Sequence, residues 1–324
     1  ALVPESVKKL TDKGFKVYLE KGAGENARYP DSSYRESGAE ILENARDILS
    51  RSQIILKVQP PTPEEIDAIT PNSFLIGFLQ NYKYPERIKM MAERKINAFA
   101  MELIPRITRA QSIDALSSQA TVAGYKASII AANMSSRFFP MLTTAAGTIR
   151  PSKVLVIGAG VAGLQAIATS RRLGAVVEAY DVRKAVKEEI ESIGAKFLES
   201  PLVAEGTGGY ARELTQEEKD QQHKFMADNI ARADVVISTA QVPGKKAPVI
   251  ITRDMVEKMR PSSVIIDIAA ENGGNCELTK PGEIIEHKGV LIYGPLNLPS
   301  TLPTHASEMY SKNLLNFLSL LTKD

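Results

Sequence analysis

Short apolar runs alternate with amphipathic segments along most of the chain, and glycine, proline or asparagine stands between them. In the first 100 residues this pattern predicts strands at 15–19, 54–58, 73–79 and 97–100, and helices at 4–10, 41–49, 64–69 and 84–94. Strands that alternate with helices are typical of a parallel α/β domain, because each parallel strand needs a crossover connection. The first third of the chain is therefore expected to form one such domain.

The same alternation resumes after one long helix, which is predicted at 115–134 and is rich in small residues. Residues 138–149 are expected to be a loop and the edge of a helix. Beyond them the pattern predicts strands at 154–157, 176–180, 194–198, 234–239, 264–268 and 290–293, and helices at 161–173, 184–193, 216–231, 255–259 and 304–321. This half is expected to be a second α/β domain, entered through the long helix.

The stretch from Lys153 to Asp181 carries the clearest chemistry. An apolar strand runs into the turn Gly158-Ala159-Gly160-Val161-Ala162-Gly163, a helix follows, and a second strand ends at Asp181. In such a fingerprint the first glycine permits the tight turn, the second lets a pyrophosphate approach the backbone, and the third allows close packing of helix on sheet. The helix directs free N–H groups at the phosphates. The order therefore predicts a Rossmann-like dinucleotide site, and a glycine turn of another α/β domain is the alternative.

Asp181 is expected to select the cofactor. It lies about 20 residues beyond the first glycine, where a carboxylate accepts hydrogen bonds from the adenosine ribose hydroxyls. A carboxylate would repel a 2′-phosphate, so NAD(H) is favoured over NADP(H). Arg183 is the opposing signal, since a guanidinium at that position could pair with a 2′-phosphate.

Composition narrows the function further. The net charge of +2 implies no nucleic-acid partner, and a single cysteine, Cys276, excludes a disulfide framework or a cysteine-rich metal site. The three histidines have no ligand spacing, so no metal site is expected. No apolar run reaches the roughly 18 residues of a membrane helix.

Two further segments lie where ligands bind in open α/β sheets, beyond the carboxyl ends of strands. Residues 101–114 follow a predicted strand and gather several polar side chains. Residues 205–211 contain three glycines within four positions, which predicts a mobile loop with Tyr210 as its aromatic tip. An ordinary solvent loop is the alternative for this segment.

Six motifs spread over the chain resemble one family: RITRAQSIDALSS, GAGVAG, GGYA, VPGKKAP, AAENGGNC and NLLNFLSLL. Together they are similar to the NAD(H)-binding soluble component of proton-translocating nicotinamide nucleotide transhydrogenase, in the alanine dehydrogenase/transhydrogenase superfamily. The resemblance implies two Rossmann-like, doubly wound parallel-sheet domains with a cleft between them. It assigns 1–116 with 304–324 to the first domain and 117–303 to the NAD(H)-binding domain. Family members usually open with one more strand, so the first sheet is expected to lack an edge strand.

The resemblance also implies the site. Near the nicotinamide it places Arg106, Gln111, Asp114 and Ser117, where a guanidinium and an amide can fix the carboxamide and a carboxylate can pair with the arginine. A purely structural Arg106–Asp114 ion pair is the alternative. Cofactor contacts are implied for Arg109, Gly158, Gly160, Val161, Gly163, Asp181, Val182, Arg183, Gly209, Tyr210, Ala211 and Gln241. Asn272 and Cys276 lie in a matching motif without an assigned chemistry.

A dehydrogenase that acts on an amino acid with NAD⁺ alone is the competing reading. Alanine dehydrogenases use a lysine on an early strand and a histidine on the next; Lys57 stands at the first position, but residues 78–82 contain no histidine. Without an imidazole, amine oxidation has no evident proton partner. Lys57 is then a snorkelling or salt-bridged lysine. A non-catalytic NAD(H) sensor is the third possibility.

The function that the resemblance implies is half of a hydride-transfer reaction. NADH held in the cleft donates a hydride directly to NADP⁺ on a partner domain, and a membrane-spanning proton-channel domain couples the transfer to proton movement. Only one glycine fingerprint is present, so the NADP(H) site is expected on that partner. The chain is expected to form a homodimer. Its expected location is peripheral to a membrane, on the bacterial cytoplasmic side or on the matrix or cytosolic side of an organelle membrane.

Overall fold

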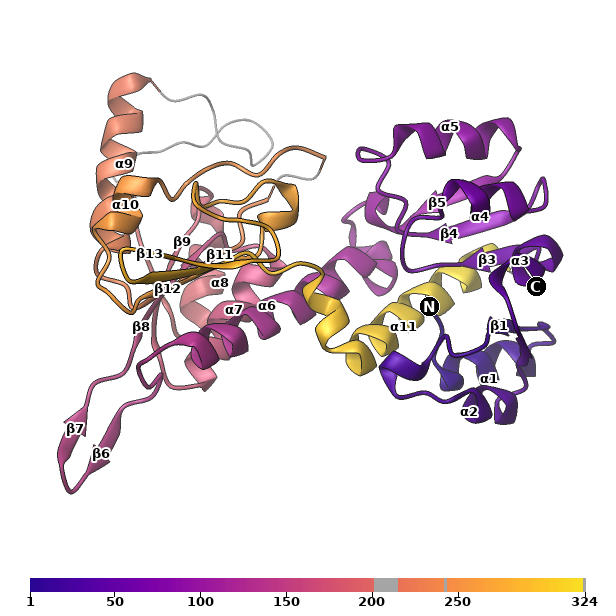
Figure 1. The fold of residues 1–324 in the computed structure, drawn as a ribbon, viewed down its shortest axis with the longest axis horizontal. Coiled ribbons are helices and arrows are strands. Elements are labelled where there is room, and N and C mark those ends of the chain that lie inside the picture. The colour runs from indigo at the N-terminus through magenta and orange to yellow at the C-terminus, as the bar shows by residue number, and fades with distance from the viewer. Residues whose placement is uncertain (201–214, 242–243, 323–324) are drawn as a thin grey trace. The chain divides into compact units, whose positions relative to one another are not determined.

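The computed structural model describes residues 1–200, 215–241 and 244–322 (Figure 1). The chain divides into two compact units. Unit 1 contains Ala1–Gln119 and Leu302–Asp324, and unit 2 contains Ala120–Thr301. The division falls within the long helix α6, Ala115–Met134, whose bounds match the sequence prediction.

Unit 1 is built from short parallel strands and the helices between them. Its strands are β1 (Tyr18–Glu20), β2 (Glu40–Leu42), β3 (Ile54–Leu56), β4 (Phe74–Gly77) and β5 (Asn97–Ala100). Its helices are α1 (Pro4–Asp12), α2 (Asp31–Glu36), α3 (Ala45–Arg51), α4 (Pro63–Ala68), α5 (Pro85–Glu93) and α11 (Pro303–Leu321), with 3₁₀ turns η1 (Glu25–Ala27), η2 (Met101–Leu103) and η3 (Thr108–Ile113). β1 and β2 form one parallel pair, and β3, β4 and β5 form a separate parallel sheet in that order.

One helix of unit 1 begins later than the sequence predicted. The prediction of a helix at 41–49 was wrong at its start, because Ile41 lies in β2 and pairs with Leu19. α3 begins only after Asn44, whose side-chain oxygen accepts a hydrogen bond of 3.0 Å from the Asp47 N–H. An asparagine cap of this kind satisfies one of the free N–H groups of the first turn and fixes where the helix begins.

The C-terminal helix α11 packs into the core of unit 1. Leu314 and Leu318 are buried together with Ile76 and Met101. The ring of Phe317 meets that of Phe99 edge-on, with centroids 5.4 Å apart. The expected packing of Leu314 and Phe317 on the first α/β part is therefore confirmed.

Unit 2 holds one seven-stranded sheet. Its strands are β8 (Lys153–Ile157), β9 (Val176–Tyr180), β10 (Lys196–Phe197), β11 (Val235–Ser238), β12 (Val264–Asp267), β13 (Ile284–His287) and β14 (Val290–Tyr293). The remaining helices are α7 (Val161–Arg172), α8 (Lys187–Ser192), α9 (Gln216–Ile230) and α10 (Arg253–Glu257), with 3₁₀ turns η4 (Lys184–Val186), η5 (Ala270–Asn272) and η6 (Leu298–Thr301). The strand order β10-β9-β8-β11-β12-β14-β13 reverses direction between β8 and β11. Ligands bind at such a switch point, outside the carboxyl ends of the strands.

Helices cover both faces of this sheet (Figure 1). Along β8, Val154 and Val156 point to one face, where Ala131 of α6 and Ile167 of α7 pack against them. Alternate positions point the other way and meet α9 and α10. Because both faces are buried, the central strands are apolar throughout, as expected for a doubly wound sheet. The predicted α/β class with parallel sheets is confirmed.

Two β elements of unit 2 differ from the sequence prediction. Residues 138–149 contain the antiparallel hairpin β6 (Leu142–Thr144) and β7 (Gly147–Ile149), which projects away from the sheet of unit 2 (Figure 1), where a loop and helix edge were predicted. β13 was not predicted and runs antiparallel to β14. The turn between β13 and β14 has positive φ at Lys288 (49°) and Gly289 (79°), which is the backbone of a tight two-residue hairpin turn.

Candidate nucleotide-binding site

The glycine turn lies directly beyond β8, at the switch point of the sheet. Gly158 has φ of +93°, a conformation that glycine adopts without the strain of a side chain. A Cβ at Gly163 would lie 1.9 Å from the carbonyl oxygen of Gly158, so helix α7 could not approach the turn if this residue were larger. A Cβ at Gly160, by contrast, would meet no atom within 4 Å among the described residues. The space beside Gly160 fits a phosphate group that approaches the backbone.

Helix α7 begins at Val161, immediately after this open space. Gly160 is its N-cap, and the Leu164 N–H donates to the Gly160 carbonyl oxygen at 2.8 Å. The N–H groups before Leu164 have no acceptor within the helix. Together with the positive end of the helix dipole they form a site for an anion. The glycine fingerprint therefore has the geometry that its sequence predicted.

Asp181 stands at the end of β9, beside the glycine turn. Its Oδ2 accepts a hydrogen bond of 2.7 Å from the Ala159 N–H, and this bond joins the acid to the turn. Arg183 makes three further bonds to the same carboxylate: its backbone N–H and Nε donate to Oδ1 at 2.8 and 3.0 Å, and Nη2 donates to Oδ2 at 3.0 Å. A carboxylate offers about four acceptor positions. All of them are filled, so a ribose hydroxyl can bind Asp181 only after the Arg183 side chain moves.

The charge of Asp181 is maintained by these contacts. Burial acts to raise the pKa of the carboxyl, but the hydrogen bonds from Arg183 and from the Ala159 backbone outweigh burial and hold the pKa below its ordinary value. Asp181 is 7% exposed and Arg183 40% exposed. The buried acid is therefore fixed and ionised at neutral pH, whereas the arginine has a path to solvent.

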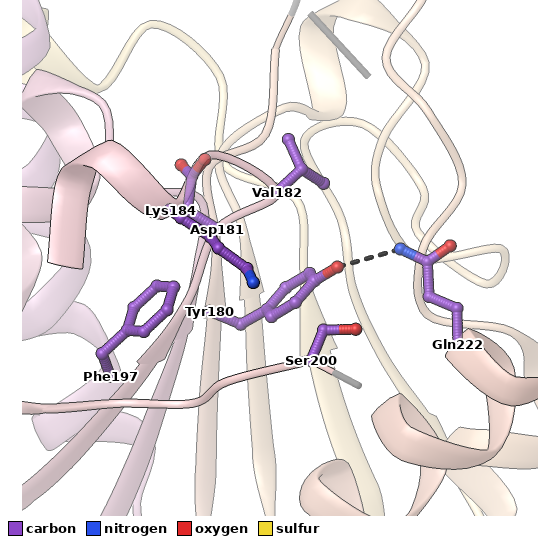
Figure 2. Close-up of a pocket in the computed structure, with 7 residues that line it drawn as sticks. All are labelled: Tyr180, Asp181, Val182, Lys184, Phe197, Ser200 and Gln222. Atoms are coloured by element: carbon purple, nitrogen blue, oxygen red, sulfur yellow. Dashed lines mark hydrogen bonds between the residues drawn. The ribbon is translucent and has the colours of Figure 1, made fainter. Parts of the chain in front are cut away.

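A small pocket adjoins Asp181 (Figure 2). Its volume of about 10 Å³ holds little more than one water molecule. The Gln222 side-chain amide donates a hydrogen bond of 2.9 Å to the Tyr180 hydroxyl at one side of it, and Val182 borders it with 37% of its surface exposed. The described side chains leave room here for the edge of a ligand but not for a whole base.

The predicted nicotinamide-end residues lie in unit 1, beyond β5. Arg106, Arg109 and Gln111 are exposed in and before the turn η3 and make no side-chain hydrogen bond or ion pair with any described residue. Asp114 bonds with Ser117 instead of Arg106: its Oδ1 accepts from the Ser117 N–H at 2.9 Å, and its Oδ2 from the Ser117 hydroxyl at 2.6 Å. The expected Arg106–Asp114 pairing is therefore wrong for this structure, because Asp114 caps the first turn of α6.

Lys57 has a structural partner. It follows β3 and forms an ion pair with Glu65 of α4, and its backbone carbonyl oxygen accepts a hydrogen bond of 2.7 Å from the Tyr310 hydroxyl. Glu65 also completes the capping box of α4 with Thr62. The prediction of a salt-bridged lysine is confirmed.

Three residues that support the site were not singled out from the sequence. Thr239, beyond β11, donates from its hydroxyl to the Gly158 carbonyl oxygen at 3.0 Å. Asp267 at the end of β12 is fully buried and accepts five hydrogen bonds, from Ser238, Ala269, Asn275, Cys276 and Thr279. Asn275 in turn bonds both backbone groups of Ala240. An acid that ends an apolar strand was the available signal for Asp267.

These supports position the residue before Gln241, which is itself exposed. The Gln241 Nε2 donates to the Ile268 carbonyl oxygen at 3.0 Å, so its side-chain oxygen is left for another partner. Gly209, Tyr210 and Ala211 lie outside the described residues. Within the described ranges no group of three or more His, Cys, Asp or Glu side chains could hold a metal ion. Among the same residues, no helix combines the length and the apolar character that a membrane span requires.

Two family models together match nearly the whole chain. The N-terminal domain model of alanine dehydrogenase/PNT matches residues 1–123, and the C-terminal domain model matches residues 127–324. An NAD(P) transhydrogenase subunit alpha from Rhodospirillum rubrum is 48% identical over 98% of this chain and 85% of that protein. The crystal structure of transhydrogenase from Sinorhizobium meliloti superposes with a TM-score of 0.89 at 45% identity, covering 99% of this chain and 89% of that one.

Alanine dehydrogenases are similar to a lesser degree. Alanine dehydrogenase 1 from Staphylococcus aureus is 29% identical over 98% of this chain and 82% of that protein. The glycine turn and Asp181 suit a nucleotide in either branch, while the sequence identities favour the transhydrogenase branch. The chain belongs to the alanine dehydrogenase/PNT family, and its similarity is greater to the transhydrogenase alpha subunits than to the alanine dehydrogenase.

Proposed function

We propose that this chain is the NAD(H)-binding component of a nicotinamide nucleotide transhydrogenase. The observation that carries the proposal is the glycine turn bonded to Asp181, in a chain that is 48% identical to a transhydrogenase alpha subunit. The turn and α7 bind the pyrophosphate, and Asp181 binds the adenosine ribose once Arg183 has moved. NADH then gives its hydride directly to NADP⁺, which is held on a partner domain. The cofactors supply the redox chemistry, and the protein supplies binding and orientation.

The reaction asks little of the side chains as acids or bases. Hydride transfer from one nicotinamide to another moves no proton at the reacting carbons. Arg106 and Gln111 are exposed and unpaired within the described structure, as groups that hold a carboxamide would be before it binds. Asp114 and Ser117 fix the start of α6 beside them. We assign Arg106 and Gln111 to the orientation of the nicotinamide, and Asp114 and Ser117 to their support.

Amino-acid oxidation is the competing function, and Lys57 argues against it. The lysine that would serve such an enzyme is engaged by Glu65, and residues 78–82 supply no histidine. L-Alanine with NAD⁺ is therefore expected to produce no NADH absorbance. Calorimetric titration of the same protein should show tighter binding of NADH than of NADPH. Alanine-dependent NADH formation, or equal affinities for the two nucleotides, would contradict the proposal.

The partners belong to the same proposal. An NADP(H)-binding domain accepts the hydride, and a membrane-spanning proton-channel domain couples it to proton movement, with this chain peripheral to the membrane. The two compact units support a division into two domains near the expected limits of 1–116 with 304–324 and 117–303.

A homodimer is supported by the hairpin β6–β7. Phe138 and Met141 beside it are 54% and 62% exposed, and Ile149 within it is 44% exposed. A two-stranded hairpin is marginally stable alone, so contact with a second copy would stabilise it. Sedimentation should find a dimer at micromolar concentration; a monomer would contradict this part of the proposal.

Replacing Gln111 with alanine should slow hydride transfer more than it weakens binding. Loss of the amide frees the nicotinamide to rotate, and misorientation of reacting groups costs about 10- to 100-fold in rate. NADH affinity, carried mainly by the glycine turn and Asp181, should change by less than about threefold. Single-turnover transfer and equilibrium titration measure the two quantities separately.

The exposed Gln221 of α9 provides a matched control, and Gln221→Ala should alter neither quantity. Equal losses of rate and affinity in Gln111→Ala would mean that Gln111 only anchors the nucleotide.

A further inference from the structure

A second cavity lies at the opposite edge of the unit 2 sheet from the glycine turn. Its volume is about 400 Å³, within the range of roughly 300–1,000 Å³ that is usual for small-molecule sites. The lining includes five basic side chains and one acidic one: Arg137, Arg150, Lys153, Arg232, Arg260 and Asp234. Lys153 begins β8 and Asp234 directly precedes β11, so this basic cavity lies at the amino ends of these strands.

Asp234 draws two of the arginines together. Its side chain is 8% exposed, and Oδ2 accepts a hydrogen bond of 2.9 Å from the Lys153 N–H, which fixes the carboxylate. Arg137 Nε and Arg260 Nη2 both approach Oδ1, at 3.4 and 3.2 Å. One buried oxygen thus holds two guanidinium groups that would otherwise repel each other.

The position of Arg232 is also set by local bonds. Its Nε donates to the Asp228 carbonyl oxygen at 3.0 Å, and its Nη2 to the Asn229 side-chain oxygen at 2.6 Å. The Arg232 carbonyl oxygen accepts from Arg260 Nη2 at 2.8 Å. Three of the five cations are therefore oriented before any ligand arrives, which lowers the entropy cost of binding one.

The basic cavity has more positive charge than its acid can neutralise. Five cations against one carboxylate leave four positive charges, although the whole chain carries only +2. Arg150 and Lys153 are exposed, and their side chains make no hydrogen bond or ion pair with any residue of the described ranges. Guanidinium groups bind phosphate oxygens through paired N–H donors, and a multiply charged anion would relieve the mutual repulsion.

We propose that the basic cavity is a second anion site, which binds a phosphate group distinct from those of the nucleotide at the glycine turn. Arg137, Arg232 and Arg260 form its fixed wall, and Arg150 and Lys153 complete the charge around the bound phosphate. The phosphate group can come from a small soluble molecule or from a phospholipid headgroup, and the two sources are separable by experiment.

The first test uses inorganic pyrophosphate. The full chain, with NADH present at saturation to fill the glycine turn, is titrated calorimetrically at constant ionic strength. The double variant Arg150→Ala/Lys153→Ala should bind pyrophosphate at least about tenfold more weakly than the unaltered protein, since each lost cation removes charge-assisted hydrogen bonds. The control Arg172→Ala/Lys224→Ala removes the same two residue types from exposed positions of unit 2 and should bind as the unaltered protein does.

The second test uses vesicles of phosphatidylcholine with or without phosphatidic acid. A headgroup source predicts co-sedimentation with the phosphatidic acid vesicles that the Arg150→Ala/Lys153→Ala variant loses and the control keeps. A soluble source predicts the calorimetric difference alone. The proposal is overturned if neither probe binds, or if the double variant and its control bind equally. NADH affinity, measured in the same proteins, should be unchanged, so failure of this site is distinguishable from failure of the nucleotide site.

Discussion

The Asp181→Ala variant should bind NADH about 10- to 100-fold more weakly than the unaltered chain. Each hydrogen bond from a ribose hydroxyl to a carboxylate contributes about 1.5–3 kcal/mol, and some of this is offset by breaking the Asp181–Arg183 pair. Affinity for NADPH should change little or rise, because the carboxylate that repels a 2′-phosphate is gone. The gap between the two nucleotides should therefore narrow in a fluorescence titration.

Asp228→Ala is the matched control, since it removes an exposed aspartate of unit 2 and should leave both affinities unchanged. An Asp181→Ala variant that folds and keeps its preference for NADH would remove Asp181 from its proposed role.

Arg183→Ala tests the other half of the same contact. Truncation of the arginine frees two of the four acceptor positions of Asp181, so the ribose no longer competes with a guanidinium. We expect NADH affinity to rise several-fold and NADPH affinity to fall, because no cation remains for a 2′-phosphate. Weaker NADH binding in this variant would mean that Arg183 contacts the bound nucleotide instead of blocking its site.

The second large effect concerns stability. Asp267→Ala should lower the free energy of unfolding by about 3–5 kcal/mol, the range for removing one partner of a buried charged network. Three backbone N–H groups and two hydroxyls lose their common acceptor inside the protein. Denaturant unfolding followed by circular dichroism measures the change.

Asp267→Asn separates charge from volume. It keeps the size of the side chain but turns an NH₂ group toward donors, so it should also destabilise the chain by more than about 2 kcal/mol. Glu286→Ala, an exposed acid on the edge strand β13, should stay within about 0.5 kcal/mol of the unaltered protein. If Asp267→Asn were as stable as this control, the network would not hold the loops of unit 2 together.

Local sequence signals were sufficient where a single element determines the geometry. The turn from Gly158 to Gly163 needs only its own strand and helix, so its spacing predicted both the open space at Gly160 and the close packing at Gly163. The all-apolar strands of unit 2 similarly predicted a sheet covered on both faces. Helix α6 was predicted to the residue because its small side chains form one uninterrupted run.

Contacts between residues distant in the chain could not be predicted from local patterns. Asp267 looked like any acid at a strand end, and only the fold brings the loop with Asn275 and Thr279 onto it. Asp114 was expected to pair with Arg106, but a cap three residues away competes more effectively than a flexible arginine. The hairpin β6–β7 lacks a core of its own, so its apolar pattern did not distinguish a strand from a helix edge.

The most direct test follows one hydrogen atom. The chain is mixed with a purified NADP(H)-binding transhydrogenase domain, NADP⁺, and NADH carrying two deuterium atoms at the nicotinamide C4, and the NADPH formed is analysed by mass spectrometry. Direct transfer predicts one deuterium in every NADPH molecule, with no exchange with solvent and no requirement for L-alanine. NADPH that carries only solvent hydrogen, or the absence of NADPH from a mixture in which both nucleotides bind, would contradict the account.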